Sequence, residues 1–231
     1  DLHSFPTRRS SDLHIENRIS KWISEKDRGI SDAFNKGIAM ATGEFIGMIN
    51  ADDWYEKDAV QQVMDHAQDA DVLYGDLRLL RNEQVDFVVK GDHQLLPKLM
   101  TINHPTVFVK RELYKNFGAF DMSYACAMDY DLLLRFYVKG SRFKHVPAVL
   151  ANMRWDGVSD KYWIKGCRET LHIKNKYQPG QKFSNYLFFL RHVAGIAVPR
   201  YMEKMRLQFL VRAYRKRFAM QKKTFEDRSS V

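Results

Sequence analysis

Cysteines and long apolar runs are scarce in this chain of 231 residues. Its two cysteines, Cys126 and Cys167, do not have the spacing of a disulfide framework or of a zinc site. No apolar run reaches the roughly 20 residues of a membrane-spanning helix, and the first residues lack the apolar segment of a secretory signal. We therefore expect a reducing, cytoplasmic setting and not a secreted or membrane-spanning protein.

Acidic residues are scarce at the C-terminal end. Residues 200–231 contain ten Lys or Arg and three Asp or Glu, and so carry a net +7 of the chain's formal charge of +9. Here the apolar residues recur at helical spacing among basic ones, which is typical of a basic amphipathic helix. We expect residues 200–223 to contact an anionic membrane surface; the alternative is packing on the domain or on a second subunit. Nucleic acid is not an expected partner, because no recognised binding module is present.

The rest of the chain has the composition of a folded domain, with 45% hydrophobic and 13% aromatic residues overall. Residues 18–49 have a strand, helix and strand pattern, with strands at 18–23 and 45–49 and a helix capped by Ser31-Asp32. This length of about 30 residues is that of a βαβ unit, which has parallel strands. The sequence therefore predicts an α/β fold with a mostly parallel sheet flanked by helices.

Further elements are expected along the chain. Helices are predicted at 56–68, 95–99, 111–117, 129–138 and 162–177, and strands at 71–74, 77–80, 85–89, 106–109 and 143–150. Gly75-Asp76 is predicted to form a turn, Gly118 to end a helix, and Pro147 to mark an edge or a bulge. Pro199 is predicted to interrupt the apolar stretch 186–198.

Asp52 and Asp53 follow the buried strand predicted at 45–49. In an open α/β sheet, ligands bind at the carboxyl ends of the strands. Two adjacent carboxylates at this position suit a hard divalent cation and, through it, the phosphates of a nucleotide. The alternative is a surface turn before the next helix, because Asp is common in turns and at helix N-termini.

Several blocks together resemble the family 2 glycosyltransferases. They are, in order, residues 24–37, 41–47, 50–55, 104–108, 118–121, 129–135 and 157–159. The resemblance implies the GT-A fold and an inverting transfer from a nucleotide-diphospho-sugar donor to a hydroxyl of a glycan or lipid-linked acceptor, as in cell-surface polysaccharide synthesis. It does not identify the sugar.

The resemblance also implies roles for individual residues. Asp53 would bind Mn²⁺ or Mg²⁺ between the two phosphates of the donor, with Asp52 at the metal or nearer the ribose. Asp27, Asn35 and Lys36 would line the nucleotide side of the pocket, where a lysine suits a phosphate. For Asn35 and Lys36 the alternative is an exposed helix face.

A second acidic site is implied around residues 128–131. An inverting displacement needs a base that accepts the proton of the acceptor hydroxyl, and Asp129 is the first choice for this base, with Asp131 the second. Many relatives carry Glu where this chain has Met128, and a simple helix cap is the alternative role for Asp129. His104 and Trp155 are candidates for the acceptor pocket, with core packing as the alternative for each.

The family begins with a strand, a helix and a strand before the first of these blocks. Residues 1–18 cannot supply them, so we expect the N-terminal βαβ portion to be missing. We divide the chain into an extraneous or disordered leader at 1–13, a partial GT-A domain at 14–180 and a basic helical tail at 181–231, expected at the inner face of the cell membrane.

Two other functions remain open from the sequence. One is a catalytically incompetent fragment or a non-catalytic membrane-surface module in which the basic tail is the functional part. The other is a different Mg²⁺-dependent phosphate enzyme built on paired Asp residues, but this would need a nucleophile motif that the sequence does not contain.

Overall fold

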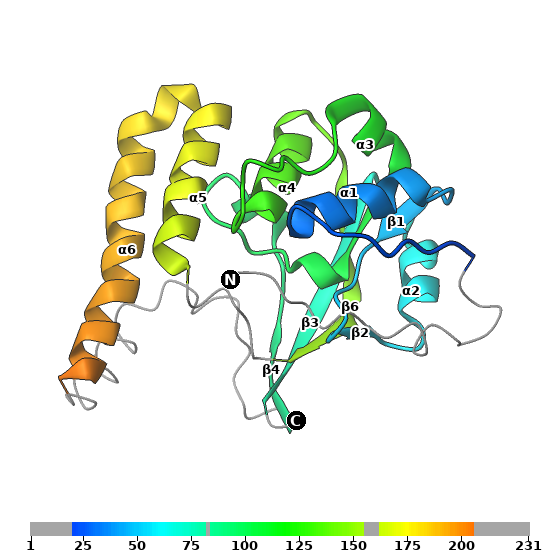
Figure 1. Ribbon diagram of the computed structural model, residues 1–231, viewed down its shortest axis with the longest axis horizontal. Helices are drawn as coiled ribbons and strands as arrows, with labels where there is room; N and C mark the ends of the chain where they lie inside the picture. The colour runs from blue at the N-terminus through cyan, green and yellow to red at the C-terminus, as the bar shows by residue number, and fades with distance from the viewer. Residues whose placement is uncertain (1–19, 82–83, 155–161, 206–231) are drawn as a thin grey trace.

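The structure is a computed structural model that describes residues 20–81, 84–154 and 162–205. In this part of the chain a single sheet is flanked by helices on both faces (Figure 1). The strands are β1 (Phe45–Gly47), β2 (Trp54–Tyr55), β3 (Val72–Arg81), β4 (Gln84–Val89), β5 (Val107–Lys110) and β6 (Phe143–Arg154). The helices are α1 (Ile30–Met40), α2 (Ala59–Asp65), α3 (Arg111–Phe117), α4 (Met128–Val138), α5 (Trp163–Tyr177) and α6 (Lys182–Lys204).

The sheet is mixed. Its strand order is β1-β5-β3-β6-β2, and β4 pairs with β3 off this path. Only β3 and β6 pair in parallel among the described strands, whereas the β1–β5, β2–β6, β3–β4 and β3–β5 pairs are antiparallel. The prediction of an α/β fold is confirmed, but the prediction of a mostly parallel sheet is wrong for these strands. The strands expected at 77–80 and 85–89 do form the hairpin that their spacing predicts, and a hairpin is necessarily antiparallel.

The expected βαβ unit does not form in the described residues. Residues 20–29 contain no strand, and α1 begins at Ile30 after Gly29, whose φ of 136° favours glycine. Asp32 does not cap the helix as predicted; its carboxylate lies in the first turn and accepts a hydrogen bond of 3.0 Å from the Arg28 backbone N–H. The predicted strand at 18–23 is therefore wrong over residues 20–23.

The central strand β3 is buried on both faces of the sheet. Val72 and Tyr74 belong to the apolar cluster shared with α1, α3 and α4, whereas Leu73 belongs to the cluster shared with α2. The sequence of a strand buried on both faces is largely apolar, because successive side chains point to opposite faces and the side chains on each face pack against apolar partners.

Gly75 does not form the predicted turn but lies within β3. A Cβ atom at Gly75 would lie 2.4 Å from Cγ of Leu150, so glycine is needed here for close contact with β6. The pairing of β3 with β6 shifts register at this point, from Tyr74 opposite His145 to Asp76 opposite Val149. This irregularity lies around Pro147 and confirms the bulge predicted there.

The helices agree better with the sequence. α3 has the predicted bounds, and Gly118 ends it with φ 86° while its N–H donates to the Tyr114 carbonyl. α4 and α5 each begin one residue from the predicted position and end at the predicted residue. α2 is shorter than predicted, and the expected helix at 95–99 is replaced by a 3₁₀ turn at His93–Leu95.

α6 continues through Pro199 to Lys204, so the predicted interruption at this proline is wrong. The helix lies at one end of the molecule and packs along α5 (Figure 1). Among residues 20–81, 84–154 and 162–205, no helix is long and apolar enough to cross a membrane. Most of the predicted basic helix, from residue 206 onward, and all of the predicted leader lie outside the described residues.

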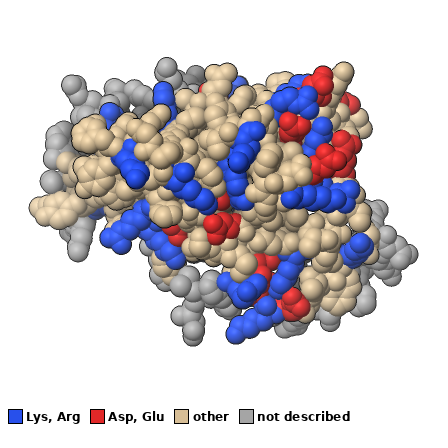
Figure 2. Space-filling view, turned by 90° about the horizontal axis from the view of Figure 1, so that it is seen from above, with Lys and Arg blue, Asp and Glu red and all other residues tan. Residues whose placement is uncertain are grey.

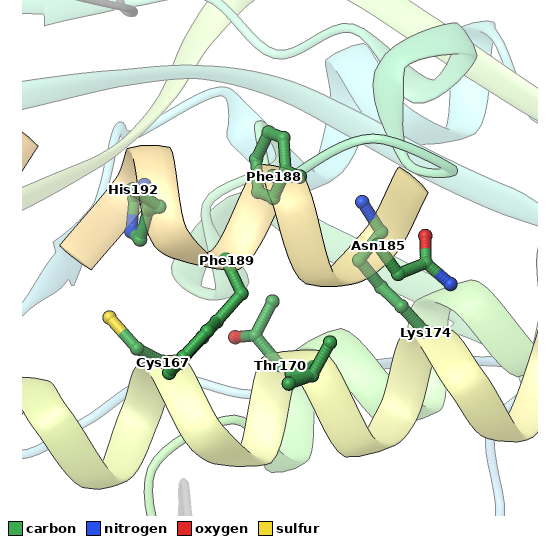
Figure 3. Close-up of a pocket in the computed structure, with 8 residues that line it drawn as sticks. Cys167, Thr170, Lys174, Asn185, Phe188, Phe189 and His192 are labelled. Carbon is green, nitrogen blue, oxygen red and sulfur yellow. The ribbon is translucent and has the colours of Figure 1, made fainter. Parts of the chain in front are cut away.

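A small pocket between α5 and α6 contains a buried lysine, Lys174 (Figure 3). Its Nζ atom donates a hydrogen bond of 3.0 Å to the Lys98 carbonyl and lies 4.0 Å from the centroid of the Phe188 ring. Burial lowers the pKa of Lys174 to about 8. The other lining residues are Cys167, Thr170, Leu171, Asn185, Phe189 and His192.

This burial predicts a pH-dependent contribution to stability. Because the pKa of Lys174 is lower in the folded state than in the unfolded state, the folded protein loses this proton first as the pH rises above about 8. The free energy of unfolding of the wild type should therefore rise by about 1–2 kcal/mol relative to Lys174→Met between pH 8 and 10. Urea titrations at each pH measure this difference. The exposed Lys182→Met variant should show no such change; equal pH dependence in both variants would contradict the assignment.

Candidate functional site

The acidic loop between β1 and β2 places Asp53 in a partly buried position. Its Oδ2 atom accepts a hydrogen bond of 3.0 Å from the Asn50 side chain, and its N–H donates to the Asn50 carbonyl at 3.2 Å. Its other carboxylate oxygen, Oδ1, is buried and has no hydrogen-bond partner among the described residues. Burial raises the pKa of Asp53, and the Asn50 hydrogen bond opposes this effect. A buried oxygen without a partner fits a carboxylate that meets a cation.

The neighbouring Asp52 is exposed. In the part of the chain that the structure describes, no three His, Cys, Asp or Glu residues come together as a metal-binding group. The protein side of a cation site would thus be one or two carboxylates. Such a donor set fits Mg²⁺ or a similar ion that takes its remaining ligands from water and from the phosphates of a substrate.

Arg154, at the end of β6, lies beside this loop and was not singled out from the sequence. Its Nη1 atom is 3.5 Å from the Asp52 carbonyl oxygen, and its guanidinium lies 5.1 Å from the centroid of the Trp54 ring. The positive charge of Arg154 lowers the pKa of Asp53, against the effect of burial. The sequence feature that could have drawn attention to Arg154 is its position directly before Trp155, a candidate for the acceptor pocket. Trp155 itself lies outside the described residues.

Lys36 and Asp27 lie together in an ion-pair cluster. The Lys36 Nζ atom lies 2.7 Å from a carboxylate oxygen of Asp27, 2.7 Å from Glu25 and 3.4 Å from Asp32. The hydrogen bonds to Asp27 and Glu25 raise the pKa of Lys36. Three carboxylates already surround the ammonium group, so a phosphate at this position would have to displace or compete with them.

Asn35 has a different environment on the same helix. Its side-chain amide donates to the Phe120 carbonyl and its side-chain oxygen accepts from the Phe120 N–H, both at 2.9 Å. Both polar groups of the side chain thus join α1 to the loop between α3 and α4. In this structure Asn35 connects two parts of the protein, and its predicted contact with a nucleotide would require these bonds to open.

His104 lies in an aromatic group next to that loop. Its ring stacks on Phe34 with a centroid distance of 4.9 Å and meets the Phe120 ring edge-on at 5.9 Å. Burial lowers the pKa of His104 to about 4, so the ring is neutral at pH 7. These contacts are those of the core-packing alternative.

Asp129 is the second residue of α4. Its Oδ1 atom accepts a hydrogen bond of 2.8 Å from the Tyr130 N–H, and burial raises its pKa. A raised carboxyl pKa brings proton affinity closer to neutral pH, which is the property that a general base needs. α4 and β1 pack into the same apolar cluster, through Leu132 on the helix and Ile46 on the strand.

Asp131 lies only two residues further along α4, but its side chain is completely buried among donors. The Arg135 guanidinium donates to one of its carboxylate oxygens at 3.1 Å, and the Lys176 ammonium and the Tyr177 hydroxyl donate to the other at 3.0 Å each. These bonds connect α4 to α5. Both carboxylate oxygens of Asp131 are thus occupied by donors within the protein, and a substrate hydroxyl would have to displace one of them.

Comparison with known proteins agrees with the sequence blocks. The model of the family described as Glycosyl transferase family 2 matches residues 12–133. A glycosyltransferase of PGL/p-HBAD biosynthesis from Mycobacterium bovis is 28% identical in an alignment of 152 residues, and the match covers 61% of this chain and 59% of the relative. The amylovoran biosynthesis glycosyltransferase AmsB of Erwinia amylovora is 28% identical over 160 residues, covering 62% of this chain and 52% of the relative.

A solved structure has a similar fold. The structure of S. aureus TarS in complex with UDP-GlcNAc matches with a TM-score of 0.51 and 16% identity, over 76% of this chain and 56% of that chain. This similarity concerns the fold, and it agrees with the GT-A type of α/β fold. The chain spans less than two thirds of the length of the two relatives named above. Since the family model matches more than half of its residues, the chain belongs to glycosyl transferase family 2.

Proposed function

We propose that the protein transfers a sugar from a nucleotide-diphospho-sugar to a hydroxyl of a glycan or lipid-linked acceptor, with inversion at the anomeric carbon. The observation that carries this proposal is the pair of unlike carboxylates on β1–β2 and α4. Asp53 has a buried oxygen without a partner among the described residues, and Asp129 has a raised pKa at the start of a helix. Asp53 therefore suits a bound cation, and Asp129 suits the base that accepts a proton.

Asp53 would hold Mn²⁺ or Mg²⁺ together with the phosphates of the donor, and Asp52 would lie at the same ion or nearer the ribose. When bound, the cation neutralises charge on the departing diphosphate. Arg154 adds a fixed positive charge beside the same loop, since its guanidinium lies near the Asp52 carbonyl and on the Trp54 ring. Leaving-group charge can be stabilised by such a preorganised cation.

Asp129 would accept the proton of the acceptor hydroxyl as the oxygen attacks the anomeric carbon. A single displacement of this kind inverts the configuration. The acid must be ionised to act as a base, so activity should fall as the pH falls through its pKa, which burial raises. Asp27, Asn35 and Lys36 would line the nucleotide side only after some of their present bonds rearrange.

The relatives suggest where to look for substrates. The TarS structure contains UDP-GlcNAc, and the two relatives from Mycobacterium and Erwinia are named for biosynthesis of PGL/p-HBAD and amylovoran. UDP-sugars are therefore the first donors to test, and the proposed setting is polysaccharide or glycolipid synthesis at the inner face of the cell membrane.

We also propose that the C-terminal part contacts an anionic membrane surface. α6 exposes apolar side chains on its outer face, namely Phe183, Tyr186, Leu187, Leu190 and Tyr201. At the α6 end of the molecule, at the left of Figure 2, Lys and Arg side chains lie among residues other than Asp and Glu. The helix carries four Lys or Arg residues and one acidic residue, Glu203. A second copy of α6 would bring like charges together, whereas anionic lipid would complement both features.

The proposed carboxylate roles predict two separable losses in the full-length protein. Asp129→Asn should lower kcat by about 10²- to 10⁴-fold and leave donor binding intact, because it removes only the base. Asp53→Asn should weaken the Mn²⁺-dependent binding of UDP. Transfer assays with a panel of UDP-sugars and calorimetry with Mn²⁺ and UDP measure the two effects.

Asp65→Asn, on the exposed end of α2, is the matched control and should change neither value. Normal turnover in Asp129→Asn would remove the base assignment. If the wild type binds neither UDP nor Mn²⁺, the alternative of a non-catalytic membrane-surface module gains support.

Asp131 and Asp129 should differ in their effect on stability. Asp131→Asn leaves Arg135 and Lys176 without their buried anion, so it should lower the free energy of unfolding by about 3 kcal/mol. Asp129→Asn should be neutral or stabilising, because burial disfavours its charged form. Denaturant titration of both variants measures this contrast, and equal destabilisation would contradict it.

The membrane proposal predicts that Phe183→Ser and Leu190→Ser together weaken binding to vesicles that contain anionic lipid by about tenfold, since two apolar anchors are lost. Vesicle co-sedimentation measures the binding. Val60→Ser is a control, because Val60 is an exposed apolar residue on α2, away from α6. Equal binding to neutral and anionic vesicles, or no effect of the double substitution, would argue against this surface.

A further inference from the structure

Glu169 on α5 binds a segment of backbone that leads directly into α4. Its Oε1 atom accepts a hydrogen bond of 3.1 Å from the Ala125 N–H, and its Oε2 atom accepts bonds of 2.8 Å and 2.9 Å from the N–H groups of Cys126 and Ala127. Only 11% of the Glu169 side chain is exposed. One carboxylate from a helix more than 40 residues away therefore holds three consecutive N–H groups.

These bonds compensate for a missing local cap. The residue before α4 is Ala127, which has no side-chain oxygen to accept hydrogen bonds at the helix start. Its carbonyl oxygen accepts the first helical hydrogen bond, from the Asp131 N–H at 3.0 Å, while its own N–H donates to Glu169. Ala127 is thus held from both sides, and Asp129 follows two residues later.

We propose that Glu169 is a positioning residue for transfer: it holds residues 125–127 so that the Asp129 carboxylate faces the acceptor hydroxyl. This inference rests on the proposed function, in which Asp129 is the base. A second effect is electrostatic, because the Glu169 charge lies at the N-terminal end of α4 and offsets the partial positive charge there. Without it, that end of the helix would stabilise the ionised form of Asp129 more strongly.

The alternative is that Glu169 only holds α4 and α5 together. Other contacts between these helices argue against this alternative. Asp131, Lys176 and Tyr177 already connect α4 with α5, about two turns further along α5. Glu169 contacts the loop before α4, and its only described ion pair, with Lys165 at 4.0 Å, is on its own helix. Its loss should therefore disorder the loop without separating the two helices.

The test is Glu169→Gln in the full-length protein, with the exposed Arg168→Gln as the control on the same helix. Glu169→Gln keeps the shape of the side chain but removes its charge and gives it a donor facing other donors. Amide hydrogen exchange at residues 125–127 should rise by at least about tenfold, since hydrogen bonds to a charged group are lost. In the same variant, kcat should fall about 10- to 100-fold with the donor KM nearly unchanged, because the base is misplaced.

The pH dependence of kcat is a further test, because a purely structural role of Glu169 would not change it. The acidic limb of kcat should shift to lower pH in Glu169→Gln, because the uncompensated helix N-terminus lowers the pKa of Asp129. Arg168→Gln should leave the exchange at residues 125–127, kcat and the acidic limb of the pH profile unchanged.

The outcomes separate this inference from the proposed function. Suppose that Asp129→Asn is inactive, but that Glu169→Gln has a normal kcat and an unshifted acidic limb of its pH profile. This result would overturn the role of Glu169 and leave the base assignment intact. Unchanged exchange at residues 125–127 in Glu169→Gln would also overturn it. An active Asp129→Asn enzyme would overturn the base assignment and this role with it.

Discussion

The parallel pairing of β3 with β6 is the interaction on which the rest of the structure depends. β3 contributes to apolar clusters on both faces of the sheet, and β6 runs beside it for almost its full length. At its far end β6 also pairs with β2, where Asn152 lies opposite Trp54. Hydrogen bonds there join Arg78 of β3 and Asn152 of β6 to Glu56, the residue after β2. The acidic loop before β2 is therefore anchored, through β6, to the most buried strand of the fold.

The two acidic residues of α4 illustrate how environment assigns different roles to the same chemical group. Asp129 and Asp131 are about 200° apart around the helix, so one lies near the loop that enters α4 and the other points toward α5. Asp131 has two cations and a hydroxyl as partners and connects helices. Asp129 has backbone donors only among its described hydrogen bonds, and burial raises its pKa. The fold thus uses one carboxylate to join two helices and leaves the other with backbone donors only among its described hydrogen bonds.

Sequence patterns predicted the helices well because their signals are local: α3 has the predicted bounds, and Gly118 ends it with a positive φ. Strand direction was mispredicted because it depends on distant partners, such as β5 between β1 and β3. Gly75 suggested a turn, although the glycine is required by its contact with Leu150. The sequence blocks identified the family, and the two acidic sites and the roles of their residues remain predictions. The structural role of Asn35 and the contacts of Glu169 could not be predicted, because their partners lie 85 and more than 40 residues away.

Two register shifts between His145 and Ala151 set which face of the sheet each later residue of β6 occupies. Beyond them, Ala151 lies opposite Leu77 and Arg154 opposite Leu80, so the guanidinium reaches the Asp52 carbonyl. Side chains alternate along a strand, and a one-residue change in register therefore exchanges the two faces. A one-residue insertion or deletion in residues 146–150 would turn Arg154 away from the acidic loop and bring Met153 to its side of the sheet. The length of this short irregular segment is thus under the same constraint as the charged residues of the site, although it contains no charged residue itself.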